Sequence, residues 1–145
     1  MTTQPDLGKV QGELCRLAAR IAFEEFGTRL DGSVDSVRNV EHILGQIHDL
    51  YCKTRLDNGL NVVALAFAAY IAGVIQTHFG PAQWERDCSL LGEETFPLIW
   101  GESRVYPYAW CLKRLFDGPD DNIWFKFQAI ILEAERKKGE GEEPR

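Results

Sequence analysis

A long uncharged stretch constrains this chain more than any other feature of its sequence. No Asp, Glu, Lys or Arg occurs between Asp57 and Glu85, and residues 60–75 read LNVVALAFAAYIAGVI. This strongly apolar part is shorter than the roughly 20 residues that a helix needs to cross a bilayer core. Asn, Gln and His side chains flank it, where a membrane helix would carry Lys or Arg anchors. The stretch therefore predicts a central helix, apolar on all sides, that is buried in a soluble domain rather than in a membrane.

Four amphipathic segments supply the elements that would pack around this helix. Each repeats apolar residues at spacings of three and four, as one face of a helix does. The expected stripes are Leu7, Val10, Leu14, Leu17 and Ile21; Val37, Val40, Leu44, Ile47 and Tyr51; Tyr108, Cys111, Leu112, Leu115 and Phe116; and Ile123, Phe127, Ile130 and Ala134, widened by Trp124 and Ile131. Gly27 is expected to end the first helix and Pro107 to begin the fourth. Trp110, Lys113 and Arg114 are expected on the outer, solvated face of that fourth helix.

The periodicity changes between the third and fourth helices. Trp84, Leu90-Leu91 and residues 95–100 are short apolar pieces separated by glycines, which predicts a small antiparallel sheet. Pro97 cannot donate to a strand ladder, so its strand should lie at an edge or be interrupted there. A length of 145 residues suits one domain. We therefore predict a single α+β domain over residues 1–138, followed by a disordered acidic tail over 139–145.

Charge and cysteine content limit the partners and the compartment. The chain has 16 basic and 22 acidic residues and a net charge of −6, without the basic stripe that nucleic-acid binding requires. Its four cysteines form no C-x-x-C pair, which argues against a zinc ribbon or a redox dithiol. The first residues lack the pattern of a secretory signal. These features predict a cytoplasmic protein with free thiols that binds neither nucleic acid nor a membrane.

Several short motifs together resemble a loose family of small uncharacterised bacterial α+β domains, over roughly residues 30–131. The motifs are Leu30-Asp31-x-Ser33-x-x-Ser36, Ala69-Tyr70-Ile71-Ala72-Gly73, Gly80-x-x-x-Trp84, Trp100-Gly101, Val105-Tyr106-Pro107, Lys113-Arg114-Leu115 and Gly118. They consist of turns, caps and packing residues. The resemblance implies an α+β fold and carries over no catalytic residue. This chain has Val74 where those domains tend to have an acidic residue.

The sequence contains no recognisable catalytic set. There is no Gly-x-Ser-x-Gly elbow and no Gly-Lys-Ser/Thr phosphate loop, and carboxylates adjacent in sequence point to different faces. No catalytic residue and no cofactor is therefore expected. One alternative stays open, a small metal-binding protein or enzyme that uses His48, Cys52 and His78. His48 and Cys52 are spaced to share a helix face, but His48 is better explained as a partly buried, hydrogen-bonded histidine. His78 is adequately explained as a histidine in the last turn of its helix.

A loop between the expected strands is the candidate interaction site. It combines Trp100, Glu102, Arg104 and Tyr106 with Trp110 from the next helix, a composition that is enriched in interface hot spots. The competing interpretation is that the aromatic residues seal the edge of the small sheet. The leading prediction is a non-enzymatic bacterial protein-interaction module, associated with immunity or secretion. Its partner would be another protein or a second copy of this chain.

Overall fold

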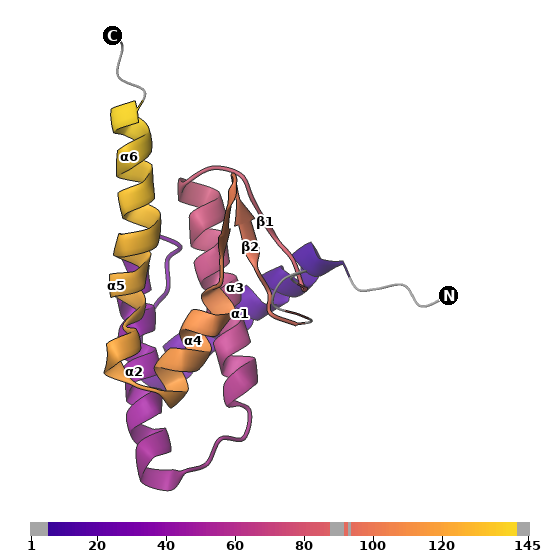
Figure 1. Ribbon diagram of the computed structural model, residues 1–145. Coiled ribbons are helices and arrows are strands. Elements are labelled where there is room, and N and C mark those ends of the chain that lie inside the picture. Colours follow the sequence, from indigo (N-terminus) through magenta and orange to yellow (C-terminus); the bar gives the residue numbers. More distant parts are fainter. Residues whose placement is uncertain (1–5, 88–91, 93, 142–145) are drawn as a thin grey trace.

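The computed structural model describes residues 6–87, 92 and 94–141, and it confirms an α+β fold (Figure 1). A three-stranded antiparallel sheet is inserted between the third and fourth helices. The elements are α1 (Leu7–Phe26), α2 (Ser36–Thr54), α3 (Leu60–His78), β1 (Ala82–Trp84), β2 (Leu98–Trp100), β3 (Ser103–Val105), α4 (Pro107–Phe116), a 3-10 turn (Pro119–Asp121), α5 (Ile123–Phe127), a π-helical turn (Gln128–Leu132) and α6 (Glu133–Gly141).

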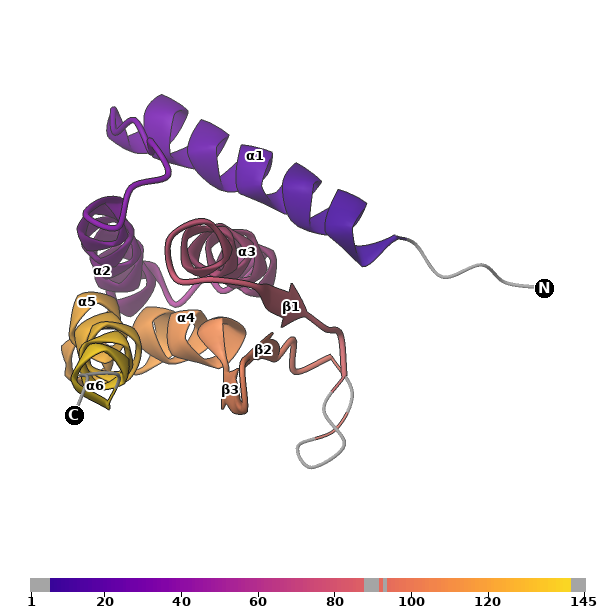
Figure 2. The same ribbon diagram turned by 90° about the horizontal axis from the view of Figure 1, so that it is seen from above.

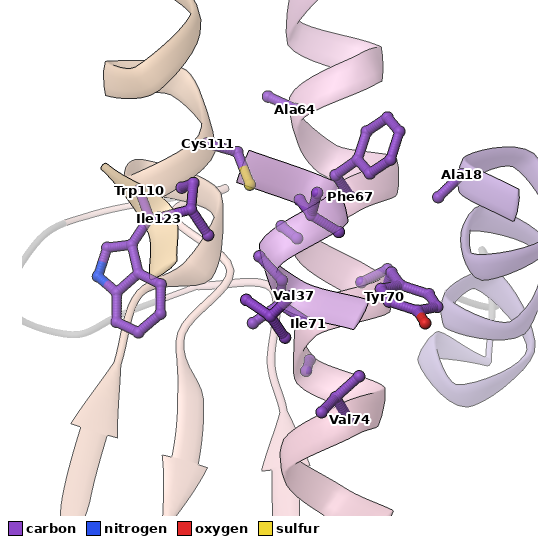
Figure 3. Close-up of a cluster of buried hydrophobic side chains, with 14 of the residues drawn as sticks. Ala18, Val37, Ala64, Phe67, Tyr70, Ile71, Val74, Trp110, Cys111 and Ile123 are labelled. Atoms are coloured by element: carbon purple, nitrogen blue, oxygen red, sulfur yellow. The ribbon is translucent and has the colours of Figure 1, made fainter. Parts of the chain in front are cut away.

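Helix α3 forms the centre of the molecule, as the uncharged stretch predicts. It packs against α1 on one side and against α4 on the other, as Figures 2 and 3 show. Phe67 and Ile71 are completely buried, and so are the small residues of the same helix, Ala64, Ala68, Ala69 and Ala72. Small side chains let neighbouring helices pack closely. Among the described helices, α3 alone has the length and apolar composition of a membrane span, but 61% of that window is buried inside the molecule.

The loop between α1 and α2 is tied to α3 by Tyr70. Helix α1 ends at Gly27 in the left-handed conformation, as predicted. The Gly32 N–H donates to the Tyr70 hydroxyl at 2.8 Å, and this hydroxyl lies 2.7 Å from the Ser36 Oγ. Burial raises the pKa of Tyr70, while its hydrogen bonds with Ser36 and Gly32 act in the opposite direction. The short chain of hydrogen bonds fixes where α2 begins relative to the central helix.

The sheet has the order β1-β2-β3, with both pairs antiparallel. Ile99 is opposite Gln83 in β1 and Arg104 in β3. Pro97 lies immediately before β2, which is the central strand of the sheet. The strand therefore begins at Leu98, the residue after the proline. The Pro97 carbonyl still accepts a hydrogen bond from the Glu85 N–H at 2.9 Å. The expected apolar piece Leu90-Leu91 lies outside the described residues.

Two expectations about the C-terminal helices are wrong. Trp110 and Arg114 are buried, because α4 is covered on both sides, by α3 and by α2. In the last helical stretch Ile131 is buried, whereas Ile130, expected on the same apolar face, is 41% exposed. The π-helical turn over Gln128–Leu132 adds a residue to one turn and moves the apolar face by one position. Helix α6 continues to Gly141, past the expected start of the tail at 139, and residues 142–145 lie outside the described residues.

Candidate functional site

The loop proposed from the sequence divides into buried aromatic residues and exposed charges. Trp100 is 5% exposed, and its indole N–H donates to the Phe79 carbonyl at 2.9 Å. Trp110 is also buried, whereas Glu102, on the turn between β2 and β3, and Arg104, within β3, are exposed. Tyr106 is half-buried before α4. The two tryptophans therefore stabilise the sheet and its contact with the helices, and the charged side chains remain available to a partner.

The three residues of the metal alternative do not come together. His48 and Cys52 are neighbours on α2, with His48 Nε2 3.3 Å from Cys52 Sγ. His78 is the last residue of α3, and the C-terminal ends of α2 and α3 lie at opposite ends of the molecule in Figure 1. The His78 Nε2 is 2.8 Å from the Gly32 carbonyl oxygen. Among the described residues, no group of three or more His, Cys, Asp or Glu side chains converges as metal ligands would. In the described part of the chain, His48, Cys52 and His78 therefore do not form one metal site.

A cavity of about 460 Å³ lies between α1, α3 and β1. Its volume is within the usual range of ligand-binding pockets, roughly 300 to 1,000 Å³. Figure 2 shows the N-terminal half of α1 above β1, and Leu7 and Val10 from this half form one wall. Leu65 from α3, Trp84 from β1 and Phe96 complete an apolar lining. No local sequence pattern identifies this cavity, because its walls come from four separate segments.

Four charged residues that are exposed to solvent also line the cavity, so its opening to solvent is polar. Glu85, Arg86, Asp87 and Glu94 all line it. Arg86 binds the Glu94 carboxylate at 2.5 Å, and the Glu94 N–H donates to Asp87 Oδ1 at 2.9 Å. Because the four residues comprise three carboxylates and one guanidinium, the opening carries an excess of negative charge. Trp84 adds a polar group to the lining residues, and its indole N–H is buried without a hydrogen-bond partner among the described residues.

Two residues at the cavity have strained backbone conformations. Glu94 has φ 56° and Phe96 has φ 49°, in the left-handed region that favours glycine. Each such residue costs on the order of 1 to 2 kcal/mol. The Phe96 N–H is held by the Arg86 carbonyl at 3.0 Å, and the ring stacks on Trp84 with centroids 5.2 Å apart. Strained residues persist only where surrounding contacts hold them in place. They are concentrated at functional sites.

A buried ion pair joins α2 to α4 on the other side of α3. Arg114 donates to Glu41 from Nε at 2.8 Å and from Nη2 at 2.9 Å, and the Ile123 N–H donates to the same carboxylate at 2.8 Å. Gly45 leaves space for the guanidinium, because an added Cβ would approach Arg114 Nη2 to 2.6 Å. Arg114 Nη1 has no partner among the described residues. A smaller cavity of about 270 Å³ opens beside this pair.

The sequence analysis missed this pair because it assigned Arg114 to a solvated face. The available signal was Gly45, since a glycine inside a helix costs about 1 kcal/mol relative to alanine and so marks a close approach. Comparisons of the chain with protein-family models, curated proteins and solved structures found no match. The function of the chain is therefore inferred from the cavity on one side of α3 and the buried ion pair on the other.

Proposed function

We propose that this chain is a non-enzymatic protein-interaction domain that binds a partner segment in the cavity between α1 and β1. The observation that carries the proposal is the combination of an apolar lining with an acidic opening. An apolar pocket that receives one anchoring side chain is the usual centre of a protein interface.

The partner segment is defined by complementarity to the cavity. Leu7, Val10 and Leu65 suit an aliphatic or aromatic side chain. The carboxylates of Glu85 and Asp87 at the opening suit Lys or Arg on either side of that anchor. We therefore expect a polypeptide with an apolar residue flanked by basic residues. The source expected from the sequence, a toxin or a secretion component in the bacterial cytoplasm, stays a prediction.

A selection from a randomised peptide library tests this function directly. The immobilised wild-type chain should enrich peptides with one large apolar residue flanked by Lys or Arg. Val10→Asp places a carboxylate in the lining and should abolish binding of the enriched peptides. Leu50→Asp is the matched control, because Leu50 is 60% exposed on α2 and does not line the cavity. The control should bind like the wild type.

Two results would overturn the proposal. The first is a selection that enriches no such peptides, or peptides that bind Val10→Asp and the wild type equally. The second is a wild-type dimer in light scattering that Val10→Asp dissociates. That result would make a second copy of this chain the occupant, in place of a separate partner.

A further inference from the structure

A different place, at the C-terminal end of α2, carries an inference that is independent of the cavity. Cys52 is exposed, and its Sγ lies 3.3 Å from Nε2 of His48, one turn earlier on the same helix. On the other side of the ring, His48 Nδ1 lies 2.8 Å from the Leu115 carbonyl oxygen. A carbonyl only accepts hydrogen bonds, so Nδ1 carries the proton in the neutral ring. Nε2 therefore presents its lone pair to the thiol.

The imidazole is held in this orientation by the backbone after α4. Gly118 has φ 107°, and an added Cβ at this position would lie 3.0 Å from His48 Nε2. Position 118 therefore requires glycine for two reasons, the positive φ and the close approach of the backbone to the ring. A nucleophile beside a base whose ring is oriented by a third group is the arrangement that activates cysteine in thiol chemistry. Helical spacing alone explains the proximity of the two side chains, but it does not explain the Leu115 and Gly118 contacts.

The other described cysteines lack these features. Cys111 is completely buried, and burial raises the pKa of its thiol. Cys15 is half-buried against α3, and burial raises its pKa as well. Neither has a histidine within hydrogen-bond distance among the described residues. Cys88 lies outside the described residues, so an experiment has to measure it separately.

We propose that Cys52 is a thiol-modification site, activated by His48, that forms mixed disulfides with low-molecular-weight disulfides. His48 Nε2 takes the proton from Cys52 Sγ, and the resulting thiolate attacks one sulfur of the small disulfide. A new S–S bond forms to Cys52 while the original S–S bond breaks. The released thiolate takes the proton back from His48. Cys52 is oxidised, the small disulfide is reduced, and no other reactant is consumed.

Oxidised glutathione is the probe, and peptide mapping by mass spectrometry gives the rate of mixed-disulfide formation at each cysteine. Cys52 should react faster than Cys15 and Cys111. His48→Asn keeps an N–H donor for the Leu115 carbonyl but removes the base, and should slow Cys52 about tenfold. His42→Asn is the matched control, because His42 is an exposed histidine on the same helix, and it is His48 that lies beside Cys52. The control should react at the wild-type rate.

A second measurement does not depend on the fold of any variant. The Cys52 rate in the native wild-type chain is compared with its rate in the urea-unfolded chain, each divided by the rate of a free model thiol under the same conditions. Activation of Cys52 by His48 predicts that this relative rate is larger for the native chain than for the unfolded chain. An equal or smaller native ratio, a Cys52 rate unchanged in a folded His48→Asn variant, or faster modification at Cys15 would each overturn the proposal.

Discussion

The two sides of α3 solve the same packing problem in different ways. On the α2 and α4 side, the bidentate Arg114–Glu41 pair fits the space that Gly45 leaves, beside a smaller cavity of about 270 Å³. On the α1 and β1 side, apolar residues surround a cavity of about 460 Å³, and the strained residues Glu94 and Phe96 line it. Under the function proposed above, the first region serves stability and the second keeps space for a partner segment. We expect substitutions on the first side to change stability and substitutions on the second to change binding.

The largest effect is expected from Arg114→Met. It leaves the Glu41 carboxylate buried without its cation, which typically costs about 3 to 5 kcal/mol of unfolding free energy. Urea denaturation followed by circular dichroism measures this change. The double variant Glu41→Leu/Arg114→Met should lose less than the sum of the two single changes, because it removes both charges. Additive losses would show that the two side chains are not coupled.

A matched pair of glycine substitutions compares the two sides next. Gly45→Ala forces a methyl group against Arg114 and should destabilise the chain by about 1 to 3 kcal/mol. Gly12→Ala, in α1, meets no atom closer than Arg16 Nη1 at 3.7 Å. It should therefore stabilise the chain by about 0.5 to 1 kcal/mol through higher helix propensity. The same urea titrations measure both, and changes of equal sign would contradict the difference in packing between the sides.

Tyr70→Phe tests the polar link between α3 and the loop before α2. Loss of the hydroxyl leaves the Gly32 N–H without its acceptor and should cost about 1 to 2 kcal/mol at neutral pH. The wild-type advantage should then shrink as the pH rises above the ordinary tyrosine value of 10.0, because the folded pKa is raised. In that range the unfolded chain ionises at Tyr70 while the folded chain stays neutral, which favours unfolding. Unfolding curves between pH 8 and 11 that run parallel for the two proteins would contradict this assignment.

The smallest effect on stability is expected for Val10→Asp. Val10 is half-buried, and its substitution places a carboxylate at a cavity that water can enter, so the unfolding free energy should change by about 0.5 kcal/mol. The same variant should lose peptide binding. A loss of several kcal/mol would instead show that this side of α3 is as tightly packed as the other.

Local rules predicted much of the fold from the sequence. The uncharged stretch identified α3 as the central helix, Gly27 ended α1, and Pro107 began α4. Each of these signals acts within a few residues, through burial, a left-handed backbone or a fixed φ. The shifted face after Phe127 was not predictable in this way, because the π-helical turn depends on tertiary packing.

The sites depend on contacts that are distant in sequence. Glu41 and Arg114 are 73 residues apart, and nothing local distinguishes them from charges on a solvated face. The cavity depends on the backbone of Glu94 and Phe96, two residue types that rarely adopt a positive φ. By contrast, helical spacing alone indicated that His48 and Cys52 could share a helix face, and the structure added the Leu115 and Gly118 contacts that orient the imidazole.

The indole N–H signals of the four tryptophans test the central claim most directly. In a ¹H–¹⁵N spectrum, each signal is assigned by a Trp→Phe variant, and a peptide enriched from the library is then titrated into the wild-type chain. Binding in the cavity predicts that the Trp84 signal shifts with peptide concentration while the Trp100 and Trp110 signals stay in place. A shift at Trp100 or Trp110 with Trp84 unchanged would contradict the account and place the partner at the turn between β2 and β3.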